Sequence, residues 1–354
     1  MHKRLSRYSL LAVAAGALLA PGAAQAATKD VHAGTPPKGL IKGVPEFAVD
    51  NSFYPKRIVV RAGDKVSFKI VGFHNVLFAA KGETPPALFV ADPATPVAGA
   101  KDAAGADFWF NGLPSILPNP AALAPSGGKI VDGSEQVGSG LPQGPPKPFV
   151  VKFPKKGTYT ALCSVHPGMQ AKIVVKGSSA DVAGKKQVAK RVAAQKKAAE
   201  KLAKKLVAGE GVPKGNVVVA GNDRNNIATL AFFPGTKTVK TGESVEFRLS
   251  KKTTEIHNVA FAPEDYAKAL AQTFLGPAGL DPVSAYPSQP FGTQLVVGDG
   301  TVHGNGYVNT GVLDAEAGSP QPDKSTVTFS KAGTYAYYCI VHGAEMKGTI
   351  KVTG

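Results

Sequence analysis

Cysteine, methionine and tryptophan are scarce in this chain of 354 residues, which contains two Cys, three Met and one Trp. Two cysteines cannot form a disulfide framework, and they are too few for a cysteine-rich zinc module. After residue 26 the chain also lacks an apolar run long enough to cross a bilayer, so no transmembrane span is predicted. Acidic residues are outnumbered by basic ones, and the formal net charge is +16.

Residues 1–26 are predicted to be a signal peptide. A basic start precedes the apolar run 10–20, which is too short for a membrane anchor, and residues 24–26 (Ala-Gln-Ala) form a small-residue cleavage site. We therefore expect an exported protein, located in the periplasm, in the cell envelope or outside the cell after cleavage near Ala26.

One stretch of the chain occurs twice, at a constant offset of 179 residues: Phe53 to Phe68 matches Phe232 to Phe247. Both copies contain short β-branched or aromatic runs broken by Gly and by Asp or Glu, a spacing typical of antiparallel strands. A repeat of this length indicates one fold used twice.

Each half also carries a loop that contains Cys, His and Met, preceded far upstream by a His-Asn-Val segment. The second loop is one residue longer than the first between its His and its Met. Both cysteines and both methionines other than Met1 belong to these loops. The predicted metal ligands are His74, Cys163, His166 and Met169 in the first half, and His257, Cys339, His342 and Met346 in the second.

A thiolate, two imidazoles and a thioether are the ligand set of a type 1, or blue, copper site. Thiolate and thioether suit the reduced ion, whereas imidazole and thiolate hold the oxidised one. A Cys-x-x-His pair could also be half of a zinc finger, but the second cysteine-rich half is absent from the sequence. We predict two type 1 copper ions, one in each half.

These residues resemble the cupredoxins, the family of plastocyanin, pseudoazurin and amicyanin. The resemblance covers most of residues 44–80, 147–177, 216–262 and 321–353. It implies an all-β fold of two Greek-key sandwiches and a role in electron transfer. It also implies that the Asn after the first ligand His (Asn75, Asn258) ties the ligand loops together, and that the second ligand His (His166, His342) is an exposed electron port. Ile340 stands where the first half has Ser164, which weakens the expected tie in the second half.

The predicted organisation has five parts. Residues 1–26 are the signal peptide, 27–43 a flexible lead, 44–177 the first cupredoxin domain, 178–215 a basic helical linker and 216–354 the second cupredoxin domain. Each domain has a long insert, at 81–147 and 263–320, to which no role is assigned. We expect the aromatic cluster around Trp109 to anchor the first insert to its sandwich, and residues 263–270 to form a helix.

The linker is predicted to contain a helix with an apolar stripe. Residues 185–205 hold nine Lys or Arg and one Glu. Three interpretations are open: a solvated helix packed on a domain by its stripe, a docking surface for an acidic redox partner or an anionic envelope surface, and a coiled coil. The stripe consists of Val188, Val192, Gln195, Ala199, Leu202 and Leu206. No nucleic-acid partner is predicted.

The same motifs disfavour an enzyme. The multicopper oxidases have a His on each side of the blue-copper Cys, and the copper nitrite reductases have a His immediately before it; neither occurs here. His32 and His303 remain, and only His303 could contribute to a further copper site between subunits. We predict an exported two-copper electron carrier with no catalytic residues. The alternative is an envelope copper-binding or copper-handling protein without a redox partner.

Overall fold

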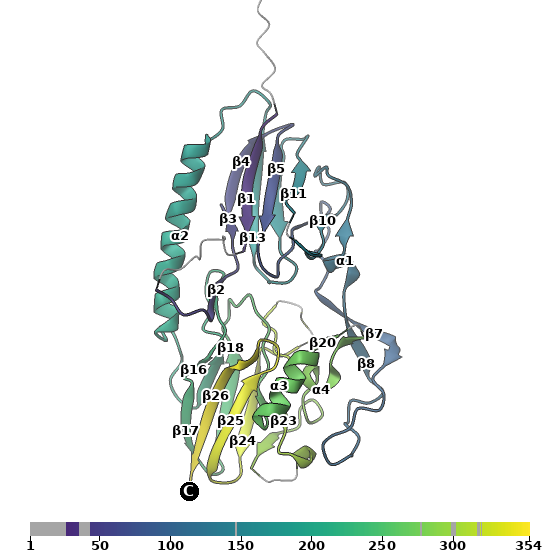
Figure 1. Cartoon of the computed structure of the whole chain (residues 1–354), viewed down its shortest axis with the longest axis vertical. Coiled ribbons are helices and arrows are strands. Elements are labelled where there is room, and N and C mark those ends of the chain that lie inside the picture. The colour runs from purple at the N-terminus through teal and green to yellow at the C-terminus, as the bar shows by residue number, and fades with distance from the viewer. Residues whose placement is uncertain are drawn as a thin grey trace, which may run out of the picture.

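The structure is a computed structural model that describes residues 26–34, 43–145, 147–276, 278–298, 302–316, 319 and 321–354. Two β-sandwiches lie end to end along its long axis, and the helix α2 (Lys185–Val207) runs along the flank of the first (Figure 1). Apart from Ala26, the predicted signal peptide falls outside the described residues. None of the helices in the described ranges combines the length and the apolar character that a membrane crossing requires.

The first sandwich consists of two sheets. Its strands are β1 (Thr28–Ala33), β3 (Phe53–Tyr54), β4 (Arg57–Arg61), β5 (Lys65–Ile70), β6 (Leu77–Phe78), β9 (Pro125–Ser126), β10 (Val137–Ser139), β11 (Phe149–Lys152), β12 (Gly157–Leu162) and β13 (Gln170–Lys176). One sheet has the order β11-β5-β1-β3 and the other the order β4-β13-β12-β6-β10-β9.

The second sandwich repeats this arrangement. Its strands are β14 (Val217–Ala220), β16 (Phe232–Phe233), β17 (Thr236–Lys240), β18 (Ser244–Leu249), β19 (Ala260–Phe261), β22 (Leu295–Val297), β23 (Val308–Asn309), β24 (Lys324–Phe329), β25 (Gly333–Cys339) and β26 (Gly343–Thr353). The sheet orders are β16-β14-β18-β24-β22 and β17-β26-β25-β19-β23. In each sandwich the first strand lies parallel to one neighbour and antiparallel to the other. The predicted all-β fold of two sandwiches is confirmed.

Each sandwich encloses its own apolar core. In β18 the buried residues Val245, Phe247 and Leu249 alternate with partly exposed ones, as expected for a strand with one face toward the core. The first core includes Cys163 and Met169, and the second includes Cys339 and Met346. Packing therefore fixes the sulfur atoms of both loops, because close-packed interiors leave side chains little freedom.

The flexible lead predicted at 27–43 is wrong in its described part. Residues 28–33 form β1, which pairs in parallel along the whole of β5 and places Val31 and Ala33 in the first core. The polar residues of this strand obscured its pattern, since Lys29, Asp30 and His32 alternate with only two buried apolar residues. Residues 35–42 lie outside the described part of the chain.

The inserts contain the remaining elements. These are β7 (Phe89–Pro96), β8 (Pro114–Pro118) and α1 (Pro120–Leu123) in the first, and α3 (Glu264–Thr273), β20 (Leu275–Gly276), β21 (Gly279–Leu280), α4 (Pro282–Ala285) and the 3-10 turn η1 (Val302–Gly304) in the second. The helix expected at 263–270 is therefore present as α3.

The aromatic cluster of the first insert does not anchor to its own sandwich. Trp109 Nε1 donates to the carbonyl oxygen of Pro287 at 2.8 Å, and the Phe110 ring stacks on Tyr286 at a centroid distance of 5.2 Å. Both partners belong to the second domain. The expectation is corrected accordingly: the first insert reaches across and shares an apolar cluster with α3 and α4 (Figure 1).

The linker helix packs through the second half of its predicted stripe, from Gln195 to Leu206. Leu206 is buried, with Ala199 and Leu202 packed beside it. Gln195, the polar member of the stripe, accepts from the Lys56 backbone N–H at 3.0 Å and donates to the Phe53 carbonyl at 2.8 Å. These contacts match the first of the three interpretations, a solvated helix packed on a domain.

A short two-stranded sheet also joins the domains. The strand β2 (Ala48–Asp50) of the first domain pairs antiparallel with β15 (Ile227–Thr229) of the second. Next to it, the Asn51 N–H donates to the Asn226 carbonyl at 2.7 Å, and Asn226 Nδ2 donates to the Gly168 carbonyl at 3.1 Å. Gly168 belongs to the first Cys-His-Met loop, so this interface borders directly on a predicted metal site.

Candidate metal centres

The first candidate site lies at the end of the first sandwich that faces the second. His74 follows β5, while Cys163 and His166 follow β12. Cys163 Sγ lies 3.7 Å from His74 Nδ1 and 3.5 Å from His166 Nδ1. All three residues are buried, and one ligand atom of each lies within 4.8 Å of the others. Two segments 89 residues apart thus converge on one point.

The second site repeats this geometry. Cys339 Sγ lies 3.6 Å from His257 Nδ1 and 3.5 Å from His342 Nδ1. The two imidazoles face each other, with 3.1 Å between their Nδ1 atoms. In both sites it is the Nδ1 atom of each imidazole that lies near the sulfur.

The predicted methionines lie in the same cores as the cysteines, but the backbone conformation at Met169 differs from that at Met346. In the first loop the Met169 N–H donates to the His166 carbonyl, and the Cys163 N–H donates to the Met169 carbonyl, both at 3.0 Å. In the second, Met346 is an inward-facing residue of β26, which starts immediately after His342. The additional residue of the second loop is absorbed as a register shift between Tyr338 and Cys339.

An asparagine ties the two ligand segments together in each site. Asn75 Oδ1 accepts from the Ser164 backbone N–H, and Asn258 Oδ1 accepts from the Ile340 backbone N–H, both at 2.7 Å. The main-chain bond is kept at Ile340, but the first site has one more bond, because Asn75 Nδ2 also donates to the Ser164 hydroxyl at 3.3 Å, and Ile340 has no hydroxyl to accept it. Buried bonds of this kind hold ligands in position before metal binds.

A glycine with positive φ leaves room for the first imidazole of each site. A Cβ on Gly34 (φ 81°) would lie 2.5 Å from His74 Nε2, and one on Gly221 (φ 75°) would lie 2.7 Å from His257 Nε2. Each glycine directly follows the first strand of its sandwich, β1 or β14. A side chain at either position would collide with a predicted ligand.

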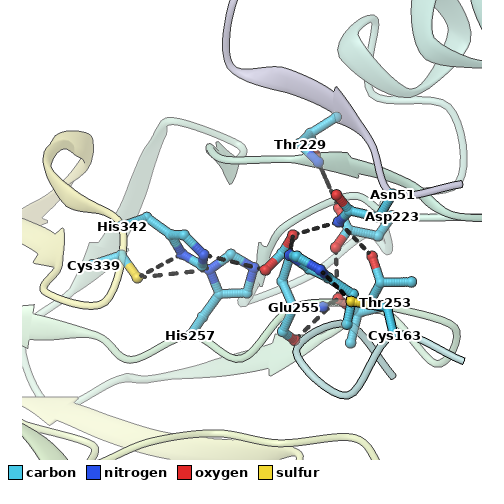
Figure 2. Close-up of polar contacts among 11 residues, drawn as sticks. Asn51, Cys163, Asp223, Thr229, Thr253, Glu255, His257, Cys339 and His342 are labelled. Carbon is cyan, nitrogen blue, oxygen red and sulfur yellow. Dashed lines mark hydrogen bonds and ion pairs between the residues drawn. The ribbon is translucent and has the colours of Figure 1, made fainter. Parts of the chain in front are cut away.

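The two sites face each other across the domain interface, with Glu255 between them (Figure 2). Glu255 Oε1 lies 3.6 Å from His166 Nε2, and Oε2 lies 3.4 Å from His342 Nε2. The carboxylate therefore contacts one ligand from each domain. His166 is only 8% exposed, and the side chain of His342 is 15% exposed. The expectation that His166 and His342 are exposed electron ports is therefore wrong for this chain.

Burial and nearby charges set the protonation of the candidate ligands. Burial raises the pKa of the Cys163 thiol to about 11. Burial acts in the same direction at Cys339, but hydrogen bonds with His257 and His342 outweigh it and lower that thiol pKa to about 5. The sulfur-to-nitrogen distances are nearly the same in both sites, so geometry favours the same ligation, and both thiols would lose their proton to a metal.

Glu255 is an anion in this setting. Burial would raise its pKa, but the hydrogen bond with His342 and the charge of His166 outweigh burial and lower the pKa to about 2. At His342, burial is likewise outweighed by hydrogen bonds with Cys339 and Glu255, which raise the imidazole pKa to about 10. Burial lowers the pKa of His166 and, to about 3, that of His74.

The two remaining histidines within the described residues lie in other surroundings. His303 pairs with Asp102 of the first insert at 3.4 Å and packs on the Phe108 ring at a centroid distance of 4.5 Å. His32 lies on β1 opposite Tyr54 and Lys69. Neither joins a cluster of potential metal ligands.

Taken together, a buried thiolate, two imidazoles presenting Nδ1 and a thioether in the same core define a soft, mixed sulfur and nitrogen donor set, which fits copper. The class is that of copper-binding β-sandwich proteins. Residues 218–353 match the family of copper binding proteins of the plastocyanin/azurin type. The second domain therefore matches the cupredoxins, and the first domain repeats its strand order and its arrangement of His, Cys and His.

Solved structures are similar over parts of the chain. A mutant plastocyanin of fern is 25% identical over 39% of this chain and 99% of its own length, with a TM-score of 0.22. A mutant of amicyanin in the Cu(I) form is 18% identical over 41% of this chain and 89% of its own, also with a TM-score of 0.22. No curated protein sequence matches the chain.

Sequence reasoning missed Glu255 and Asn51. Asn51 comes from the first domain, and its Nδ2 donates to Glu255 Oε1 at 2.5 Å and to Thr254 Oγ1 at 3.0 Å. One signal was available: Glu255 stands two residues before a ligand His, where the first half has Gly72. A carboxylate so close to one predicted site and absent from the other could have been recognised as a departure from the repeat.

Proposed function

We propose that this cupredoxin is an exported electron carrier with two type 1 copper ions, one held by each set of ligands. The observation that supports this most directly is the duplicated geometry: in both sandwiches a buried Cys faces two imidazole Nδ1 atoms at 3.5–3.7 Å. Bound copper would supply one-electron redox chemistry. The protein would contribute ligands held by Asn75 and Asn258, so that little rearrangement accompanies a change of oxidation state.

The proposal is tested by spectra of the copper-loaded protein. We expect two bound coppers and an intense visible band from charge transfer between cysteine sulfur and copper. Cys163→Ala and Cys339→Ala should each remove one coloured, paramagnetic centre and leave the other. A colourless protein that takes up stoichiometric zinc after growth with ample copper would refute it. Coloured centres that cannot be reduced and reoxidised reversibly would favour the alternative of an envelope copper-handling protein.

We further propose that the two centres have different reduction potentials. Met346 lies on a strand and Met169 directly after a turn, and Glu345 adds an exposed negative charge beside the second site only. Glu255 also lies closer to His342 than to His166. Negative charge favours the oxidised, more positive centre, so we expect the lower potential at the second site. Redox titration of the two cysteine variants measures each centre alone, and equal midpoints would contradict the proposal.

For partners, we propose that α2 attracts an acidic redox protein or an anionic envelope surface. Its outward face carries exposed lysines along its full length, including Lys186, Lys190, Lys197 and Lys201. Their attraction should weaken with salt, because the Debye length is about 8 Å at physiological ionic strength. Replacing these four with Gln should slow electron exchange with an acidic carrier at low salt. Rates that do not respond to ionic strength in either protein would exclude this role.

A further inference from the structure

The side chains of the two inward-facing ligands form a continuous chain with Glu255. His166 and His342 each have Nδ1 near their own cysteine and Nε2 near one oxygen of the same carboxylate. The separations on the carboxylate side are 3.6 and 3.4 Å.

The position of Glu255 is fixed from both domains. Its backbone N–H donates to Thr253 Oγ1 at 2.9 Å within the second domain, and its Oε1 accepts from Asn51 Nδ2 of the first. Its side chain is 10% exposed. A buried carboxylate is costly unless it is paired and hydrogen-bonded, and here Asn51 and His342 are its hydrogen-bond partners while His166 contacts it. Residues of both domains therefore hold the Glu255 side chain in place at the interface.

The surrounding main chain holds the interface shut at the same place. The strands β2 and β15 pair directly beside Asn51, and Asn226 binds the Gly168 carbonyl in the first ligand loop. The first ligand loop cannot move away from Glu255 without breaking these bonds. The distance between the two sites is therefore set by the fold and not by a chance encounter of mobile domains.

We propose that the path His166–Glu255–His342 carries electrons between the two metal centres, so that the chain acts as one two-centre redox unit. This rests on the proposed function, since it requires a redox-active metal in each site. The transfer is simple to balance: one electron leaves the reduced centre and enters the oxidised one, and no bond is made or broken. The half-reduced state arises when an external one-electron donor delivers a single electron to the oxidised protein. Glu255 is a positioning residue in this scheme, because it acts through the two ligands.

The experiment follows electron redistribution after a fast, substoichiometric pulse of a one-electron reductant to the copper-loaded full chain. The wild type should show a first-order phase, independent of protein concentration, in which one centre loses the electron and the other gains it. Cys163→Ala and Cys339→Ala should lack this phase, because each has one centre only. The two centres are distinguished by the spectra of these single-site variants.

Three variants distinguish the effect of the Glu255 contacts on electron transfer from the effect of its negative charge on the potentials. Glu255→Gln removes the charge and should raise both midpoint potentials, because a negative charge favours the oxidised centres. Glu255→Asp keeps the charge but is one methylene too short to contact both rings, so it should lose the first-order phase with much smaller changes in potential. Glu264→Gln, on the exposed face of α3, is the matched control and should change neither quantity. Asn51→Ala provides a fourth variant in which Glu255 is intact but loses its hydrogen bond from the first domain, and it should slow the phase.

Pulsed paramagnetic resonance of the fully oxidised proteins shows whether the interface stays closed, since it measures the separation of the two centres. Loss of the first-order phase in Glu255→Asp at an unchanged separation would support the bridge. An unchanged phase in both Glu255→Asp and Glu255→Gln would overturn it, as would redistribution that depends on protein concentration in the wild type. Failure of the proposed function looks different, because the single-site variants would then show no reversible copper centre.

Discussion

The substitution Gly34→Ala should disturb the first metal site and leave the second intact. Gly34 has φ 81°, and a Cβ there would lie 2.3 Å from His74 Cδ2 and 2.4 Å from the Val71 carbonyl oxygen. Neither neighbour can retreat easily, since His74 is buried and the Val71 N–H is bonded to the Ala33 carbonyl. We expect the His74 ring to be pushed away from Cys163.

The magnitude can be worked out with a matched position. Gly63 has φ 95°, and a Cβ there would meet nothing within 4 Å. Gly63→Ala should therefore cost only the left-handed backbone penalty, about 1–2 kcal/mol. Gly34→Ala should cost that penalty and about 1–3 kcal/mol more for overpacking. The difference between the two variants isolates the collision with the ligand.

Chemical denaturation of the metal-free proteins measures these costs, and visible spectra after copper loading measure the effect on the site. Gly34→Ala should weaken or shift the band of the first centre, while the band of the second serves as an internal reference. Gly63→Ala should leave both bands unchanged. The reasoning fails if the two variants have equal stability and identical spectra.

Three further predictions follow from the contacts described. Asn258→Ala should cost about 1–3 kcal/mol, because the Ile340 N–H is left buried without its acceptor, and copper should dissociate faster from the second site than from the first in the same protein. Trp109→Ala removes the bond to Pro287 and should loosen the packing of the first insert on the second domain, which limited proteolysis would detect as faster cleavage within residues 81–147. In the metal-free protein the pKa of Glu255 is lowered from 4.5 to about 2, so its contribution to stability is complete above about pH 4.5 and is lost as the pH falls toward 2. Denaturation of Glu255→Gln across this range should lack that part of the acid dependence.

Much of each site was predictable because its chemistry depends on residue types that are rare in this chain. With two Cys and two internal Met, the ligand loops could be assigned by elimination, and the repeat supplied the first His of each set. The strand β1 was not predictable, since its pattern is broken by charged residues. The partner of Trp109 was hidden for another reason: an aromatic cluster shows that an apolar surface exists nearby, but not which domain provides it.

The domain interface was the part least predictable from the sequence, and a comparison of the two halves shows why. If the domains were independent carriers, the positions beside their ligands could differ without any relation between the differences. Instead, Glu255 stands where the first half has Gly72, and Asn51 stands where the second half has Leu230. Each departure alone is unremarkable in sequence, yet the fold brings Asn51 and Glu255 within hydrogen-bond distance, between His166 and His342. Asn51 and Glu255, which have no counterpart in the other half, are thus residues that connect the two domains. This argues for two specialised halves of one unit.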